Sequence, residues 1–383
     1  MRKKGLARVP APLVGGSTER DASAYVQARS NYANHFADRY VAEFYRPAAI
    51  GGVVSSIGIG TYLGECTADD DAGYTDAIEA AISSGVNLID TAINYRCQRS
   101  ERAVGAAIRR AIAQGTARDA IVVSTKGGFV PLADTPPATR DAYREYLKRE
   151  FFDTGVLTPD DVIAGGHSLA PSFLRYAIHR SRANLGLDSI DLYYLHNPEQ
   201  QLAAVSAASL RERLRAAFMV LEDAVTRGEI RAYGCATWTA LRVPPGTKTH
   251  LSIQDLVDIA REVAGERNHF RAIQLPINLA MPEAVRLPTQ QIGRNPGLVP
   301  AVEAASSLGL SVFASASLMQ AQLTRDLPPS VKQLFPTQRT DAQRALAFVQ
   351  SIPGVTSALV GTKNRQHVAE NLESAFRSHA AAR

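Results

Sequence analysis

The sequence predicts a closed (β/α)8 barrel of the TIM type, with an N-terminal hairpin and enlarged loops after some strands. Between Ile57 and Phe376, short apolar and β-branched runs alternate with longer segments of helical period, as in a parallel sheet covered by helices. Eight strand–helix units fit into this stretch, and eight units close a barrel. The rival prediction, a doubly wound open sheet, needs a G-x-G-x-x-G motif, and Gly58-Ile-Gly60 is only a fragment of one.

The chain before the barrel is predicted to form an extension over residues 1–45, partly disordered or helical, ahead of one barrel domain over 46–383. Met1 to Arg8 is basic and lacks the apolar run of a secretory signal, which indicates a solvated tail. A short helix is expected near Ser23–Phe44. The pair Gly51-Gly52 is expected to supply the turn of the hairpin before the first strand.

Each predicted strand is a short apolar run, and each is followed by a predicted helix. The strands are expected at Ile57–Gly60, Val86–Ile89, Ile121–Thr125, Ile190–Leu195, Ile230–Ala236, Ala272–Leu275, Leu310–Ala314 and Thr356–Val360. The helices are expected at Asp71–Ser84, Ser100–Gln114, Ser172–Leu185, Leu210–Arg227, Ile253–Ala264, Leu298–Leu308, Asp341–Gln350 and Asn364–Phe376. The hydroxyl of Ser172, which follows Pro171, predicts a helix N-cap there.

Three long segments, 127–170, 277–297 and 319–338, show no regular period, and we expect them to cover the rim of the barrel and set its specificity. Their large apolar residues favour a partly apolar substrate; these are Phe129, Tyr143, Phe151, Phe152 and Met281.

Composition excludes several classes of function. The net charge is only +5, and no basic stripe is interleaved with aromatic residues, so nucleic-acid binding is not expected. No apolar run reaches the length of about 18 residues that a membrane span needs. The three cysteines are far apart and form no CxxC metal pattern, which suits a reduced, cytoplasmic protein. The sequence does not predict the oligomeric state.

Four polar side chains are predicted to meet at one rim of the barrel. Asp90 ends the second predicted strand, Lys126 follows the third and His196 the fourth, while Tyr95 lies on the loop after the second. Side chains at the carboxyl ends of barrel strands face the same cavity. Taken singly, each residue has a commoner structural role, such as a cap, a solvated charge or packing. The prediction of a site depends on all four occurring together.

These residue types suit proton donation to a carbonyl oxygen. A free tyrosine has a pKa of about 10, and a nearby ammonium such as that of Lys126 favours its phenolate. Asp90 can hold Lys126 protonated, and His196 can donate a hydrogen bond to the same oxygen. The motif offers no protein nucleophile, so a hydride from a nicotinamide cofactor is the natural complement. His167, Trp238 and Cys97 are weaker candidates for the cavity wall.

The sequence resembles the aldo-keto reductases from about Phe44 to Phe376. The resemblance lies in four motifs in this order: Asp90-Thr-Ala-x-x-Tyr95, Ser100-Glu-x-x-x-Gly105, Ser124-Thr-Lys126 and Tyr194-Leu-His196. It implies a (β/α)8 barrel and NADP(H)-dependent reduction of a small carbonyl substrate. It also implies that Tyr95 is the general acid, supported by Lys126, Asp90 and His196.

The resemblance assigns further residues to the cofactor. Gln274 matches the glutamine that binds the nicotinamide carboxamide, and Thr237 follows Ala236 where the family usually has Ser-Asn. Ser315 stands where an aromatic ring often stacks on the nicotinamide. The residues implied at the adenosine phosphate are Gly361, Thr362, Lys363, Arg365, His367, Glu370 and Asn371.

Lys363 and Arg365 supply positive charge that suits a 2′-phosphate, and Gly361 and Thr362 lead into a helix N-terminus, which favours an anion. His367 stands where an arginine is common in the family, so NADP(H) is expected with NAD(H) as the alternative.

Two other functions remain open at this level. The altered residues Ala236 and Ser315 also suit a cofactor-binding sensor or regulatory subunit with little turnover. A Schiff-base aldolase that uses Lys126 is a third hypothesis, since a phosphate site at Gly361-Thr362 would suit it.

Overall fold

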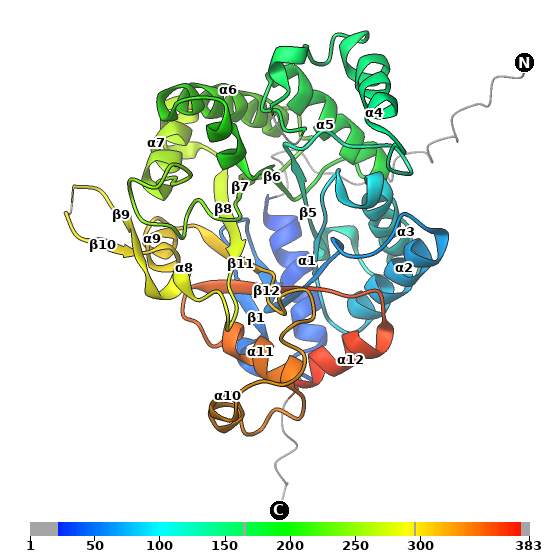
Figure 1. Cartoon of the computed structure of the whole chain (residues 1–383). Coiled ribbons are helices and arrows are strands. Elements are labelled where there is room, and N and C mark those ends of the chain that lie inside the picture. The colour runs from blue at the N-terminus through cyan, green and yellow to red at the C-terminus, as the bar shows by residue number, and fades with distance from the viewer. Residues whose placement is uncertain (1–21, 164–165, 295, 377–383) are drawn as a thin grey trace, which may run out of the picture.

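Eight parallel strands close into a barrel in the computed structural model, which describes residues 22–163, 166–294 and 296–376. The strand order around the barrel is β11-β12-β3-β4-β5-β6-β7-β8, and helices surround it (Figure 1). The predicted (β/α)8 barrel is therefore confirmed.

All eight predicted strands and the helices that follow them are present, with ends that shift by a few residues. The barrel strands are β3 (Ile57–Gly60), β4 (Leu88–Asp90), β5 (Val122–Gly127), β6 (Leu192–His196), β7 (Tyr233–Ala236), β8 (Phe270–Pro276), β11 (Ser311–Ser315) and β12 (Val355–Gly361). The helices are α2 (Ala68–Ser83), α3 (Arg99–Ala113), α5 (Pro171–Leu185), α6 (Ala207–Thr226), α7 (Ile253–Ala264), α9 (Ala301–Ser307), α11 (Asp341–Gln350) and α12 (Arg365–Glu373).

Two predicted helix starts are wrong. Pro171 is the first residue of α5, so Ser172 is not its N-cap, and the Ser172 hydroxyl instead donates to the Val156 carbonyl at 2.7 Å. The segment Leu298–Pro300 is a strand, β10, that pairs antiparallel with β9 (Pro288–Gln291). Pro300 biases the residue before it toward extended backbone, so the helix cannot include Leu298 and Val299 and begins at Ala301.

The three enlarged loops contain elements that the sequence analysis missed. These elements are α4 (Arg140–Leu147), α8 (Glu283–Arg286), the β9–β10 hairpin and α10 (Pro329–Leu334), and the hairpin projects at the side of the barrel (Figure 1). In the first loop, Phe151 is fully buried and packs with Leu147 and Phe173 in a small core, with Tyr143 and Phe152 against it. The aromatic residues of the first loop therefore pack within the loop and do not form a surface for substrate; Phe129 is the exception.

The predicted N-terminal hairpin is present as β1 (Tyr45–Pro47) and β2 (Val53–Ser55), with the glycine pair in its turn. The predicted helix near Ser23–Phe44 is α1 (Ala22–His35), which is shorter than expected and packs against β2. The Tyr32 hydroxyl anchors α1 by donating to the Val86 carbonyl at 3.1 Å. The expected solvated tail, Met1 to Arg8, lies outside the described residues.

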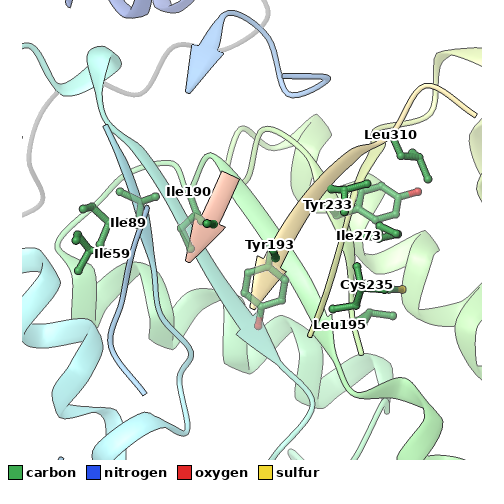
Figure 2. Packing of buried hydrophobic residues seen from close by; sticks show 14 of the residues in the cluster. Ile59, Ile89, Ile190, Tyr193, Leu195, Tyr233, Cys235, Ile273 and Leu310 are labelled. Carbon is green, nitrogen blue, oxygen red and sulfur yellow. The ribbon is translucent and has the colours of Figure 1, made fainter. Parts of the chain in front are cut away.

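The apolar core has two layers because side chains on a strand alternate between its faces. The outer layer fills the space between strands and helices, and Figure 2 shows Ile59, Ile89 and Ile273 within it. The inner layer fills the barrel below the cavity and includes Leu192 and Phe313. In the described part of the chain, no helix has the length and apolar character to cross a membrane.

A buried charge cluster lies at the amino-terminal end of the barrel. The Asp191 carboxylate accepts hydrogen bonds from Arg29 and Arg118, both at 2.8 Å, and from Arg231 at 3.2 Å. Burial alone would raise the pKa of Asp191, but the three guanidinium groups lower it to about 2. Through Arg29, this cluster ties α1 to the floor of the barrel.

Candidate active site

A cavity of about 760 Å³ opens at the carboxyl ends of the strands. Most of the residues that the sequence analysis selected line it. They are Asp90, Tyr95, His196, Thr237, Gln274, Ser315, Gly361, Thr362, His367, Glu370 and Asn371. Lys126, Lys363 and Arg365 do not line it. In the described residues, no group of histidine, cysteine, aspartate or glutamate side chains is arranged to hold a metal ion.

Lys126 lies behind the cavity wall, beneath Tyr95. Its ammonium donates to the Asp90 carboxylate at 2.6 Å and to the Thr91 carbonyl at 2.7 Å. The Lys126 Nζ lies 4.8 Å from the centroid of the Tyr95 ring. With only 1% of its side chain exposed, Lys126 acts on the cavity through its neighbours.

The Asp90 carboxylate is held by three side chains. In addition to Lys126, the Ser124 hydroxyl donates to its Oδ1 at 2.7 Å and the Gln274 amide donates to the same oxygen at 2.9 Å. Ser124 was not predicted as a site residue, although it lies two residues before Lys126 in the motif Ser124-Thr-Lys126. These contacts fix the direction in which Asp90 presents its charge to Lys126.

The protonation states of Tyr95 and Lys126 are set by opposing effects. Burial raises the pKa of Tyr95, and the charge and hydrogen bond of Lys126 oppose this without reversing it. The effect expected of Lys126 is therefore present, but burial outweighs it, and the phenol stays protonated. Burial alone would lower the pKa of Lys126, but Asp90 and Tyr95 raise it above its ordinary value, so the ammonium is retained.

His196 lines the cavity as a neutral imidazole. Burial lowers its pKa far below the ordinary value, and the Lys126 charge and the nearby His167 lower it further. Its ring contacts Tyr95 edge-on, with centroids 5.7 Å apart, and contacts Phe129 in the same way at 5.0 Å. A neutral histidine here can donate one hydrogen bond, but it does not carry a proton to be given up at neutral pH.

His167 positions the end of β6 and does not reach the cavity. It is fully buried, and its Nε2 donates to the His196 carbonyl at 2.8 Å. The Gln201 amide then donates to the other ring nitrogen, Nδ1, at 2.8 Å, and Gln201 in turn accepts from Arg213. Because the His196 carbonyl can only accept, these partners fix the neutral tautomer of His167.

The buried His167 should make stability depend on pH. Burial lowers its pKa from 6.5 to about 4, so the unfolded chain binds more protons between these values and stability is lost as the pH falls. Its contribution to the unfolding free energy should drop by about 2 kcal/mol between about pH 7.5 and about pH 5. Urea unfolding of wild type and His167→Gln at both pH values measures this, and the variant should show the shallower dependence.

The matched control for this experiment is His179→Gln, which removes an exposed histidine on α5 and should keep the wild-type dependence. Equal pH dependence in His167→Gln and wild type would contradict the assignment.

Glu199, to which the sequence analysis gave no role, holds the loop after β7. Its buried carboxylate accepts from the backbone N–H groups of Trp238 at 2.8 Å and Thr239 at 3.2 Å. Burial raises the pKa of Glu199, and these hydrogen bonds oppose the rise. The same loop carries Thr237, whose hydroxyl is buried at the cavity without a hydrogen-bond partner in the described part of the chain. A buried hydroxyl of this kind suits a polar ligand group.

The backbone after Tyr95 is strained. Arg96, Cys97 and Gln98 have φ angles of 47°, 54° and 68°, a region that non-glycine residues rarely adopt. Arg96 holds this turn, because it donates to the Glu65 carbonyl at 2.8 Å and to Asp71 at 2.6 Å. Cys97 is buried outside the cavity wall, and burial raises its pKa to about 12. Strain of this kind persists only where the surroundings impose it, so Tyr95 is presented on a rigid turn.

The far end of the cavity lies at the start of α12. Gly60 and Gly361 are directly paired across β3 and β12 there, and both line the cavity without a side chain that would fill it. Thr362 and the mostly buried Asn371 flank this space. Arg365 is exposed as the first residue of α12, while Lys363 forms an ion pair with Asp70.

The wall beside Tyr95 combines aromatic and amide side chains. Tyr62, Phe129 and Trp238 supply aromatic surface, and Asn94 and Asn197 supply amides. Of the large residues expected to contact substrate, Phe129 is at the wall and Met281 is not.

Comparisons with known proteins find a family model and individual relatives that this chain resembles. The family model described as the Aldo/keto reductase family matches residues 56–245. D-threo-aldose 1-dehydrogenase of a Pseudomonas species is 32% identical over 193 residues, which cover 49% of this chain and 51% of that protein. The 6-dehydroglucose reductase of Novosphingobium aromaticivorans is 24% identical over 303 residues, which cover 78% of each protein.

Two solved structures share the fold. An aldo/keto reductase from Klebsiella pneumoniae, crystallised with NADP and acetate, gives a TM-score of 0.57 at 21% identity and covers 86% of this chain and 89% of its own. The glycerol dehydrogenase of Gluconobacter oxydans gives a TM-score of 0.57 at 20% identity, with the same coverage of 86% and 89%. The chain spans about half the length of the Pseudomonas relative, at 51%.

Proposed function

Because this chain belongs to the aldo/keto reductase family, we propose that it reduces an aldehyde or ketone to an alcohol with NADP(H), with NAD(H) as the alternative cofactor. The observation that carries the proposal is the buried arrangement of Tyr95, Lys126 and Asp90 beside His196 at the cavity. The reductase and dehydrogenase names of the relatives, and the NADP in the Klebsiella structure, support the same activity.

The residues that line the cavity suit a dinucleotide. Next to Gln274, Thr237 offers a buried hydroxyl that has no hydrogen-bond partner among the described residues, which suits the carboxamide of a nicotinamide. The paired Gly60 and Gly361 leave room for the pyrophosphate beside the N-terminus of α12, where backbone N–H groups favour an anion. When bound, the reduced nicotinamide supplies the hydride that the carbonyl carbon accepts.

The protein supplies the proton and the charge stabilisation. Tyr95 stays protonated in the buried site, so its hydroxyl can donate to the carbonyl oxygen and release its proton as negative charge develops there. The retained ammonium of Lys126 stabilises the resulting phenolate, and Asp90 keeps that ammonium charged and aimed. His196 offers a neutral N–H donor to the same oxygen.

The aldolase hypothesis is disfavoured by the state of Lys126. A Schiff base forms from a neutral amine, and enzymes that use one lower the pKa of the lysine. Here Asp90 and Tyr95 together raise the pKa of Lys126, and its ammonium is already bonded to Asp90 and the Thr91 carbonyl.

The substrate that fits the wall best is a small carbonyl compound with hydroxyl groups. Aromatic faces such as Trp238 pack against the apolar side of such a molecule, and the amides of Asn94 and Asn197 can pair with hydroxyls. The names of the Pseudomonas and Novosphingobium relatives refer to aldose and glucose derivatives, which supports this class. The cytoplasmic location stays a prediction.

The decisive experiment follows the oxidation of NADPH and of NADH in the presence of a panel of aldehydes and ketones that includes aldoses. The proposal expects oxidation that depends on the carbonyl compound and on Tyr95. Tight cofactor binding without turnover across the panel would favour the sensor alternative, which the altered residues Ala236 and Ser315 suggest.

A further inference from the structure

Lys363, the lysine expected to meet a 2′-phosphate, is held away from the cavity. Its ammonium pairs with the carboxylate of Asp70 in the first turn of α2. Gly73 of the same helix packs against it, since a Cβ at Gly73 would lie 3.3 Å from the Lys363 Cβ and 3.1 Å from its carbonyl oxygen. The Lys363 side chain therefore lies along α2, and it is absent from the cavity wall.

Asp70 is a fixed partner. Its second oxygen accepts from the backbone N–H of Glu65 at 2.6 Å, and only 10% of its side chain is exposed, against 49% for Lys363. A carboxylate in the first turn of a helix is also favoured by the helix dipole. The hydrogen bond from Lys363 contributes most to a lowered pKa of Asp70, so the carboxylate stays charged at neutral pH. The Asp70 carboxylate is therefore the fixed member of the pair, and it sets the position of the more exposed Lys363 side chain.

At the start of α12, no lysine or arginine of the described residues lines the cavity to bind a phosphate monoester, and the exposed Arg365 lies outside its wall. The side chains around the start of α12 are those of Thr362, His367, Glu370 and Asn371, of which Glu370 is acidic. A 2′-phosphate is bound by charge-assisted hydrogen bonds from lysine or arginine, and repelled by carboxylates.

We propose that Asp70 is a cofactor-specificity residue. It keeps Lys363 on α2, so the site binds NAD(H) and NADP(H) with similar affinity, and loss of the Asp70 charge frees Lys363 to favour NADP(H). This inference rests on the proposed function only in that the cavity binds a nicotinamide dinucleotide. Asp70 does not line the cavity and acts through Lys363.

The test measures binding and needs no turnover. Dissociation constants for NADP⁺ and NAD⁺ are determined by isothermal titration calorimetry for wild type, Asp70→Asn, Lys363→Met and the double variant. Asparagine removes the charge and still accepts from Glu65. We expect wild type to bind both dinucleotides within about threefold, and Asp70→Asn to bind NADP⁺ about tenfold more tightly with NAD⁺ unchanged. The double variant should return to wild-type values, and Lys363→Met alone should change neither constant.

Asp69→Asn is the matched control, since it removes an exposed carboxylate from the same turn and should leave both constants unchanged. Three results would overturn the proposal: a wild type that prefers NADP⁺ more than about tenfold, a Lys363→Met variant that binds NADP⁺ more weakly, or an unchanged ratio in folded Asp70→Asn. If Asp70→Asn does not fold, the NADP⁺ and NAD⁺ constants of wild type and of Lys363→Met still test the first two of these results. Binding of neither dinucleotide to wild type would refute the proposed function itself.

Discussion

Replacement of Tyr95 by phenylalanine is expected to lower kcat for carbonyl reduction by about 10²- to 10⁴-fold, the usual contribution of a positioned general acid. Phenylalanine keeps the ring that contacts Lys126 and His196, and removes only the hydroxyl that gives the proton. The dissociation constant of the cofactor should not change, because it does not depend on that hydroxyl. Steady-state kinetics together with calorimetry separates these two effects.

The matched control is Tyr146→Phe, which removes a phenol hydroxyl that donates to the Pro131 carbonyl outside the cavity wall. Its kcat should stay near that of wild type. A Tyr95→Phe variant with wild-type kcat would remove Tyr95 from the mechanism. The raised pKa of Tyr95 further predicts that wild-type kcat loses no activity through ionisation of the free phenol until well above neutral pH.

Replacement of Asp191 by asparagine is expected to lower the free energy of unfolding by about 3–5 kcal/mol. The change is nearly isosteric, but it leaves Arg29, Arg118 and Arg231 without their shared counter-charge. The Arg29 side chain is fully buried, so water cannot compensate for the loss. Urea unfolding at neutral pH measures the effect. Asp160→Asn, which removes an exposed carboxylate, should leave stability nearly unchanged.

The same carboxylate predicts a loss of stability in acid. The pKa of Asp191 is lowered in the folded state from 3.8 to about 2, so its contribution is complete above about pH 4 and disappears as the pH falls through about 2. This contribution amounts to about 2 kcal/mol. The Asp191→Asn variant should lack this part of the acid transition. An acid transition identical to that of wild type would contradict the assigned role of Asp191.

The sequence was sufficient for features that depend on local period and on topology. Alternation of apolar runs placed all eight strands, and the convergence of strand ends in a barrel brought Asp90, Tyr95 and His196 together with Lys126 behind them. The second of these features follows from topology alone, because the carboxyl end of every strand lies at the same rim of the barrel. Local exceptions, such as the first residue of α5, depended on a single competing hydrogen bond.

What could not be predicted depends on partners far away in the chain. The pairing of Lys363 with Asp70 joins residues 293 positions apart, and no local pattern distinguishes that lysine from one that faces a phosphate. The role of His167 depends on Gln201 and on the His196 carbonyl. Every residue has a backbone carbonyl, so the sequence does not indicate which one His167 will contact. The net effect on the Tyr95 pKa required the extent of burial, because a nearby charge and desolvation act in opposite directions.

The long separation in the chain between Arg29 of α1 and its partner Asp191 affects when this contact can form during synthesis. Arg29 leaves the ribosome 162 residues before Asp191, which at about 5–20 residues per second amounts to roughly 8–30 s of translation. During that interval α1 has neither its ionic partner nor a finished barrel to cover. The ion pair between Arg29 and Asp191 can therefore form only after half of the strands have been synthesised, so the base of the barrel is completed by a late, long-range contact.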